Sequence, residues 1–256
     1  MVLTGNDTEE IEKLQKYLAT MFEMKDLGQL QYFLGIEVSR SNLGISLCQR
    51  KYVLDLLTKT RMLTCKLVET PMEMHHLLEI YFDQSLVDIG RYQRIVGKLI
   101  YLTHTRPYIA YVVSMVRKFM HAPNEEHIRA VYRILKYLKD APGKGLLYSN
   151  NEASTIEGYT HVDWAGDRST KKSTSGYFMF VEGNLVIRRS KKQKVVARSS
   201  AEVEFRDCSK PVQHVRTKHV EIDCHFIKEK MDQKIIQFPF VKSEGQLADI
   251  LTKAVS

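Results

Sequence analysis

The chain has 256 residues and a formal net charge of +8, from 38 Lys and Arg against 30 Asp and Glu. Hydrophobic residues make up 44% and charged residues 27%, proportions that exclude a disordered or fibrous chain. The densest apolar stretch, 109–116, is far too short to cross a bilayer, and the N-terminus lacks a secretory pattern. Four cysteines without a CxxC pair argue against a disulfide scaffold. We therefore expect an intracellular protein, cytoplasmic or nuclear, whose basic charge permits a polyanionic partner.

Apolar spacing predicts the elements of the first half. Residues 9–24 repeat apolar side chains every three or four positions, which indicates an amphipathic helix. Two apolar runs, Tyr32 to Val38 and Ile45 to Cys48, flank a polar turn that ends in Gly and predict a β-hairpin. Further helices are expected at 52–70, 92–102, 109–120 and 124–140, with a loop over 72–90.

The Pro- and Gly-containing segment 141–145 stops the last of these helices, and we place a domain boundary there. Beyond it the sequence predicts short strands at 146–148, 155–162, 177–181, 185–187 and 195–197. Helices from residue 199 and over 220–231, a strand at 235–241 and a closing helix at 246–254 complete the pattern. Strands followed by alternating helices and strands are typical of an α/β domain. The predicted fold class is therefore mixed α/β, with domains 1–145 and 146–256.

A basic run without any acid lies between Val186 and Arg198. It contains Arg188, Arg189, Lys191, Lys192, Lys194 and Arg198. On a hairpin arm these side chains could follow a phosphate backbone, where each neutralised phosphate releases counterions. A solvated basic face is an equally good interpretation of the same residues.

Three acids deserve comparison with a metal site: Asp163 at the end of a strand, Glu204 in a helix and Asp249 near the start of the closing helix. Two-metal phosphodiester chemistry needs several acidic oxygens around Mg²⁺ ions ~4 Å apart. Acids on three separate elements converge only through the tertiary fold. Spacing alone therefore leaves ordinary surface acids as the alternative.

Motifs along nearly the whole chain, in the same order, resemble the Pol polyprotein of copia-type LTR retrotransposons. The first half contains Met24-Lys25-Asp26-Leu27-Gly28, Tyr32 to Val38, Tyr92 to Tyr101 and Thr105-Arg106-Pro107. The second half contains Asp163-Trp164-Ala165-Gly166, Lys172 to Tyr177, Ser199 to Phe205 and Gln246 to Lys253. The resemblance implies the C-terminal, thumb and connection part of a reverse transcriptase over 1–145, followed by an RNase H-like domain over 146–256.

The family's activities are RNA-directed DNA polymerase and RNA–DNA hybrid ribonuclease, both with Mg²⁺ as the expected cofactor. The resemblance implies a template–primer or hybrid as the partner, no membrane, and a primer grip at the hairpin Phe33 to Val38. The family's polymerase carboxylates lie upstream of the segment that Met1 to Asp7 resembles. We therefore expect no nucleotide addition by this chain alone.

The second half departs from the family's set of four RNase H carboxylates. His161 stands where the first is expected, while Glu204 and Asp249 fit two others. The segment with the remaining one is missing, which indicates an internal deletion near 208–214. Asp163 shares the face of His161 but is ~6.6 Å further along the strand, and imidazole is a poor ligand for hard Mg²⁺. The family also usually has Trp where this chain has Arg188.

The sequence thus predicts a degenerate Pol fragment without catalysis that retains binding of an RNA–DNA hybrid and can associate with an intact Pol protein. Two alternatives stay open. One is a residual Mg²⁺-dependent hybrid ribonuclease that uses Asp163, Glu204 and Asp249, with the metal held by Glu204 and Asp249. The other is a non-enzymatic, basic nucleic-acid-binding module built on the Arg188 to Arg198 run.

Overall fold

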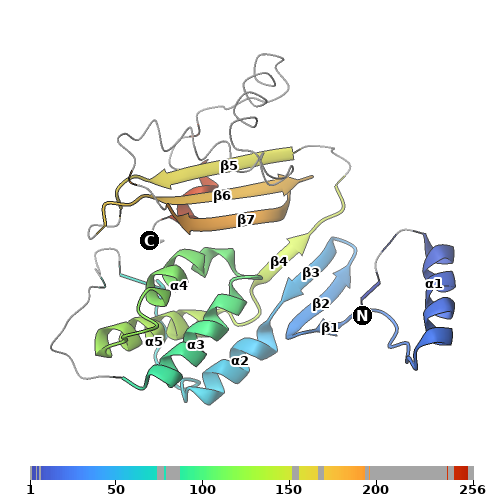
Figure 1. Cartoon of the computed structure of the whole chain (residues 1–256), viewed down its shortest axis with the longest axis horizontal. Coiled ribbons are helices and arrows are strands. Elements are labelled where there is room, and N and C mark those ends of the chain that lie inside the picture. The colour runs from blue at the N-terminus through green and yellow to red at the C-terminus, as the bar shows by residue number, and fades with distance from the viewer. Residues whose placement is uncertain are drawn as a thin grey trace, which may run out of the picture.

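The computed structural model (Figure 1) describes residues 2, 3, 5, 7–73, 78, 87–151, 156–166, 170–193, 196, 241 and 245–252. The helices predicted from residue 199 and over 220–231 lie outside these residues, as does nearly all of the strand predicted over 235–241. Within them the chain forms two antiparallel sheets beside a group of helices, which confirms a mixed α/β fold. In this described part, no helix combines the length and apolar character that a membrane span requires.

The first sheet has the strand order β1-β2-β3-β4 and is antiparallel throughout. Its strands are Tyr32–Phe33 (β1), Ile36–Ser41 (β2), Gly44–Cys48 (β3) and Gly145–Tyr148 (β4). The predicted single strand over 32–38 is wrong, because Leu34 and Gly35 both adopt positive φ angles, 49° and 84°. Two such residues make the tight turn of a hairpin. The second hairpin, β2–β3, agrees with the prediction.

Two tyrosines hold the first hairpin tip to the helices. The Tyr101 hydroxyl donates a hydrogen bond to the carbonyl oxygen of Leu34. The Tyr52 ring packs edge-on against Tyr101, with centroids 5.4 Å apart, and covers Gly35. A Cβ on Gly35 would lie 3.3 Å from the Tyr52 ring, so both space and backbone angle favour glycine there.

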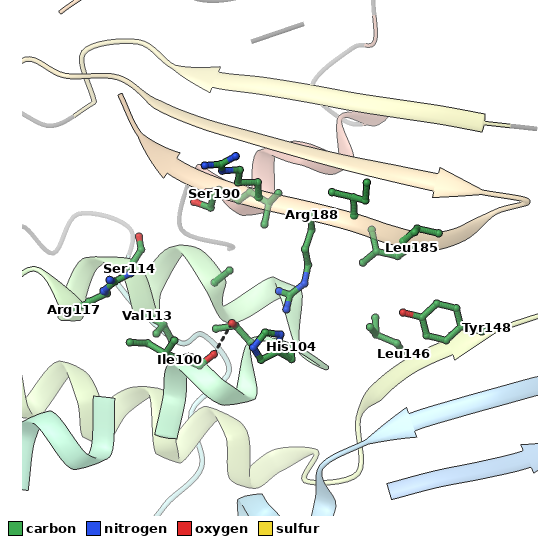
Figure 2. A pocket seen from close by; sticks show the side chains of 16 residues that line it. Ile100, His104, Val113, Ser114, Arg117, Leu146, Tyr148, Leu185, Arg188 and Ser190 are labelled. Carbon is green, nitrogen blue, oxygen red and sulfur yellow. Dashed lines mark hydrogen bonds between the residues drawn. The ribbon is translucent and has the colours of Figure 1, made fainter. Parts of the chain in front are cut away.

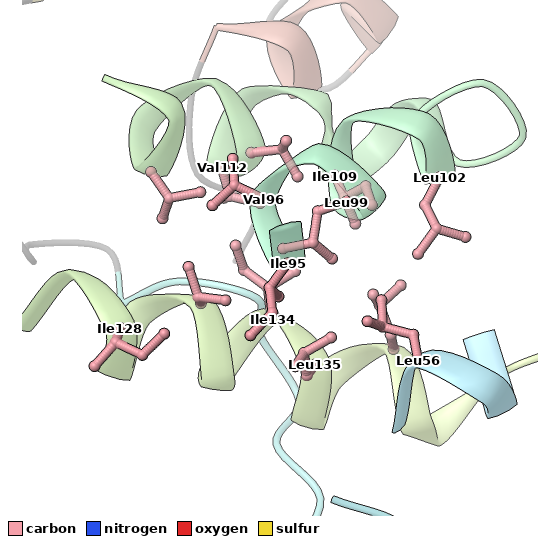
Figure 3. Close-up of a cluster of buried hydrophobic side chains, with 14 of the residues drawn as sticks. Leu56, Ile95, Val96, Leu99, Leu102, Ile109, Val112, Ile128, Ile134 and Leu135 are labelled. Carbon is pink, nitrogen blue, oxygen red and sulfur yellow. The ribbon is translucent and has the colours of Figure 1, made fainter. Parts of the chain in front are cut away.

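Four helices and a short 3₁₀ turn form the main core. They are Arg50–Lys59 (α2), Ile89–Leu102 (α3), Pro107–Ile109 (η1), Ala110–Arg117 (α4) and Glu125–Asp140 (α5). All four helices correspond to predicted ones, with the break at Pro107 where proline was expected to start a new element. The helix predicted over 52–70 is too long, since α2 ends at Lys59. Their apolar stripes face one another in Figure 3, where Leu56, Leu99 and Leu135 are at most 2% exposed. This cluster extends from Val53 to Leu138.

The buried hydroxyl of Tyr92 lies inside this core and donates a 2.7 Å hydrogen bond to the carbonyl oxygen of Val116. Burial raises the pKa of Tyr92 well above its ordinary value of 10.0. Above about pH 10 the unfolded chain therefore loses a proton that the folded chain keeps, and the free energy of unfolding falls by about 1.4 kcal/mol per pH unit from this group.

Replacement of Tyr92 with phenylalanine should remove this contribution to the fall of the free energy of unfolding above about pH 10. It should also lower the free energy of unfolding by about 1 kcal/mol at neutral pH, because the hydrogen bond is lost. Urea unfolding of both proteins at pH 8 and at pH 11 measures the difference. Equal alkaline slopes in the two proteins would contradict the assignment.

The second sheet has the order β5-β6-β7 and consists of Ile156–Asp163 (β5), Thr174–Val181 (β6) and Asn184–Lys192 (β7). All three strands were predicted, β6 and β7 as shorter ones. The turn at Glu182 and Gly183 has positive φ angles at both residues, in agreement with the predicted tight turn. The closing helix is the short 3₁₀ helix Leu247–Leu251 (η3) rather than an α-helix, and its Ala248 and Leu251 pack against Phe178 of β6.

Strand β4 connects the two sheets. The sequence placed residues 146–148 in the second domain, but β4 pairs with β3 of the first sheet. Directly after it, the backbone of Ser149 makes two hydrogen bonds with the Asn184 side chain at the start of β7, of 2.7 and 2.8 Å. The three-stranded sheet therefore lies beside the helices with β4 at the junction (Figure 1). The predicted boundary near residue 145 stays a prediction.

Helix Thr8–Met21 (α1) confirms the first predicted helix, with the Asp7 side chain accepting a hydrogen bond from the backbone N–H of Glu10. It buries none of its residues and lies apart from the other elements in Figure 1. The apolar side chains that predicted an amphipathic helix, such as Leu14 and Met21, are consequently exposed. The periodicity was sufficient to predict the helix but not what its apolar face contacts.

Candidate functional site

The RNase H-like candidate site lies where η3 packs on β5 and β6. Two hydrogen bonds attach η3 to the sheet. The Gln246 side chain, which also caps η3 by accepting a 3.2 Å hydrogen bond from the N–H of Ala248, donates one to the carbonyl oxygen of Thr160 in β5, at 3.1 Å. Ser190 of β7 donates the other to the carbonyl oxygen of Leu251, at 2.6 Å. The short helix is therefore tied to both edges of the sheet.

His161 and Asp249 meet at this junction. The distance from His161 Nε2 to Asp249 Oδ1 is 3.0 Å, and both side chains are about a quarter exposed, at 24% and 27%. The two contacting atoms themselves are shielded from solvent. The fold thus brings together the two positions that the resemblance assigned to the first and last carboxylates, but one of them is an imidazole. When protonated, this imidazole forms an ion pair with the carboxylate.

Asp163 ends β5, where it pairs with Thr174 of β6. Its carboxylate lies over the following turn, so that a Cβ on Gly166 would be only 1.7 Å from Asp163 Oδ2. Among the residues that the structure describes, no three His, Cys, Asp or Glu side chains are grouped closely enough to hold a metal ion. Asp163 therefore does not complete a three-ligand site with His161 and Asp249.

The residues described at this junction do not fit a Mg²⁺ site. Mg²⁺ needs oxygen ligands in near-octahedral geometry, whereas Asp249 faces an imidazole at contact distance. An imidazole is a poor ligand for Mg²⁺, and it occupies the side of Asp249 Oδ1 that a metal ion would need. Glu204, the other residue predicted to hold Mg²⁺, lies outside the described residues, so its part in the site stays a prediction.

The predicted basic run is divided by the pleat of β7. Arg189 and Lys191 are exposed, whereas Arg188 is half-buried and pairs with Phe178 of β6, on the face that η3 covers. Burial lowers the pKa of the Arg188 guanidinium, and the nearby Tyr148 opposes the shift. Lys194 and Arg198 lie outside the described residues.

Arg188 opens into a cleft of about 530 Å³ between β7 and the helices α3 and α4. In Figure 2 its side chain points from the strand toward His104 at the end of α3. The sequence pattern did not indicate this cleft, because the walls of the cleft come from parts of the chain that are distant in sequence. The substitution of Arg for the family's usual Trp at position 188 was the only signal that pointed to it.

The predicted primer-grip hairpin presents an exposed tip. Tyr32, Phe33 and Leu34 have exposed fractions of 51%, 42% and 70%. The Lys51 ammonium lies 6.0 Å from the centre of the Tyr32 ring. An aromatic tip with a cation beside it is suited to contact a nucleic acid through stacking and charge, and its role stays a prediction.

Comparisons with known proteins agree with the motifs. A family model described as "Reverse transcriptase (RNA-dependent DNA polymerase)" matches residues 1–74. The retrovirus-related Pol polyprotein from transposon RE1 of Arabidopsis thaliana is 37% identical over 100% of this chain and 20% of its own length. The corresponding polyprotein from transposon TNT 1-94 of Nicotiana tabacum is 31% identical over 100% of this chain and 23% of its own. No solved structure matches the chain.

A putative transposon Ty5-1 protein of Saccharomyces cerevisiae is 30% identical over 80% of this chain and 67% of its own length. Fold and similarities together define a protein related to reverse transcriptases of retrotransposons. The chain belongs to the family of copia-type Pol polyproteins. It spans about a fifth of the length of the polyproteins it matches.

Proposed function

We propose that this chain is a Pol-derived fragment that binds RNA–DNA hybrid without cleaving it. The observation that supports the loss of cleavage is the 3.0 Å contact between His161 and Asp249. Two carboxylates at these positions would attract a divalent cation, since their negative charges repel each other without one. An imidazole beside the Asp249 carboxylate adds no second negative charge, so the repulsion that would favour a bound metal ion is absent.

Binding is supported by the exposed cations of β7, Arg189 and Lys191, and by the overall charge of +8. Exposed cations on a strand edge bind phosphates mainly by releasing counterions, so affinity should depend strongly on salt. Retention of this charge without the carboxylate set distinguishes a binding fragment from an active nuclease. An association with an intact Pol protein would bring this surface to the partner's nucleic acid.

The test uses purified full-length chain and a labelled RNA–DNA hybrid, with Mg²⁺ and with Mn²⁺. We expect no cleavage above the rate in buffer, together with binding that weakens steeply as salt increases. Replacement of Arg189 and Lys191 by glutamine should lower the slope of log K against log salt by about two. Replacement of Arg129, exposed on α5, serves as the matched control and should leave the slope unchanged.

Two results would overturn the proposal. Metal-dependent cleavage that disappears in both Glu204→Gln and Asp249→Asn would establish the residual ribonuclease instead. Affinity for the hybrid that does not change with salt would exclude the basic surface as the binding site.

A further inference from the structure

The cleft beside Arg188, here named the Arg188 cleft, has walls from five elements, α3, α4, β4, β7 and η3, which come from both halves of the chain. The cationic and polar lining consists of Thr103 and His104 at the end of α3, Ser114 and Arg117 of α4, Tyr148 of β4, and Arg188, Arg189 and Ser190 of β7. The apolar lining includes Ile100, Val113, Leu146, Leu185 and Leu251. Its volume of about 530 Å³ is in the range of small-molecule sites, which are apolar clefts with a few convergent polar groups.

Charge in the Arg188 cleft has a single sign. Three arginines and one histidine line it, and no Asp or Glu is present among the described lining residues. Arg117 and His104 are exposed at its rim, whereas Arg188 is half-buried within it. By comparison, Arg133, which is also partly buried, pairs with Glu73 at 2.8 Å. The described lining of the cleft offers Arg188 no such negative partner.

A half-buried guanidinium without a carboxylate partner loses hydration that nothing in the described lining replaces. The ionisable group that interacts with Arg188 is the Tyr148 phenol, and burial raises the pKa of that phenol, so it stays uncharged at neutral pH. An anion that enters the cleft would recover this lost solvation. The planar guanidinium fork binds two oxygens of a phosphate at once, which makes arginine the preferred residue for such ligands.

The two serines of the lining already use their hydroxyl protons. Ser114 donates to the carbonyl oxygen of Tyr111 at 2.7 Å, and Ser190 donates to that of Leu251 at 2.6 Å. Recognition of an anion in the cleft would therefore depend on the arginines. A terminal phosphate, with nearly two charges and three free oxygens, fits several guanidinium groups better than a singly charged diester does.

We propose that the Arg188 cleft binds the phosphate of a phosphomonoester, carried either by a free nucleotide or by the 5′ end of a nucleic-acid strand. The apolar lining residues, among them Ile100 and Leu251, would face the organic part of the ligand. Arg189 lines this cleft and also belongs to the exposed surface that we propose for hybrid binding, whereas Arg188 belongs only to the cleft and Lys191 only to the exposed surface. The phosphate site does not depend on whether the chain cleaves or binds a hybrid.

Calorimetric titration of the full-length chain with inorganic phosphate, with adenosine 5′-monophosphate, and with a short oligonucleotide carrying a 5′-phosphate or a 5′-hydroxyl tests the proposal. We expect the phosphomonoesters to bind, and the 5′-phosphate to improve oligonucleotide affinity over the 5′-hydroxyl. Replacement of Arg188 with methionine should weaken these affinities about 10- to 100-fold, because charged hydrogen bonds are lost. Arg188→Lys should retain part of the affinity but lose the bidentate contact.

Lys191→Met is the matched control, since Lys191 lies on the same strand, is exposed and does not line the cleft. It should leave phosphate binding unchanged while weakening hybrid binding, so failures of the two proposals are distinguishable. Equal affinity of wild type and Arg188→Met for phosphate would overturn the site. If adenosine 5′-monophosphate binds but the two oligonucleotides bind equally, the site takes the phosphate of a free nucleotide and not that of a strand end. If neither adenosine 5′-monophosphate nor the 5′-phosphate binds better than its phosphate-free counterpart, the proposal is wrong.

A second measurement applies if the Arg188 variants do not fold. Phenylglyoxal modifies accessible arginines, and the modified residues are identified by mass spectrometry of the wild-type chain. Phosphate should slow the modification of Arg188 several-fold while that of the exposed Arg129 stays the same. Equal rates at Arg188 with and without phosphate would contradict the proposal.

Discussion

Replacement of Arg106 with methionine is expected to lower the free energy of unfolding by about 3 kcal/mol. Arg106 is only 1% exposed, and its guanidinium donates hydrogen bonds to the carbonyl oxygens of Ala141 and Pro142, at 2.8 and 2.5 Å, and to the Tyr108 hydroxyl at 2.9 Å. Hydrogen bonds to charged groups contribute about 1.5–3 kcal/mol each. Removal of a buried charge offsets part of this loss.

The position of these bonds makes Arg106 more than a local contact. It lies between α3 and η1 and is bonded to the chain directly after α5, so it connects the helices to the segment that leads into β4. The preceding Thr105 donates a buried hydrogen bond of 2.8 Å to Gln49, just before α2. Two neighbouring residues of the Thr105-Arg106-Pro107 motif therefore fix three connections, and the motif has a structural explanation in this chain.

Urea unfolding measures the effect. Arg106→Lys should be less destabilising than Arg106→Met, because an ammonium keeps the charge but lacks the fork that spans two carbonyl oxygens. The control is Arg129→Met, whose side chain is 65% exposed and which should change stability by less than about 0.5 kcal/mol. Arg106→Met and Arg129→Met with the same midpoint would show that the buried hydrogen bonds contribute little.

Elements with a local cause could be predicted from the sequence. Helix α5 begins at Asn124 as expected, because the Asn124 side chain accepts a hydrogen bond from the N–H of His127. Local signals were also present where the prediction was wrong. Gly35 interrupts the 32–38 run, and its positive φ angle ends β1 early. A single strand was nevertheless predicted there, because the run is otherwise rich in apolar residues that favour strands.

Contacts between distant segments could not be predicted from spacing. His161 and Asp249 were paired only through the family resemblance, since nothing in the intervening sequence fixes where η3 packs. The sequence predicted Arg188 only as one member of a basic run that either binds nucleic acid or is solvated, because the strand pleat does not reveal which face another element covers. Its burial depends on α3 and α4, which belong to the other half of the chain.

The packing of η3 leads to the second prediction, in which Gly176→Ala destabilises the protein by about 1–3 kcal/mol. Gly176 of β6 lies directly opposite His161 of β5. A Cβ at this position would lie 2.6 Å from the Leu251 Cβ and 3.0 Å from the Thr252 Cγ2, closer than packed carbon atoms approach. Because η3 is held at both edges of the sheet, it has to shift as a whole to relieve the clash.

A shift of η3 moves Asp249 away from His161, so the substitution should affect more than global stability. We expect faster hydrogen exchange at the backbone amides of 247–252 in Gly176→Ala, in addition to a lower urea midpoint. Gly158→Ala is the matched control in β5, because the nearest atom to its added Cβ is the Phe178 carbonyl oxygen at 4.0 Å. If both substitutions change exchange at 247–252 equally, the close approach at Gly176 is not what positions η3. If only Gly176→Ala changes the exchange at 247–252, the absence of a Cβ at Gly176 determines where η3 packs and where the His161–Asp249 pair forms.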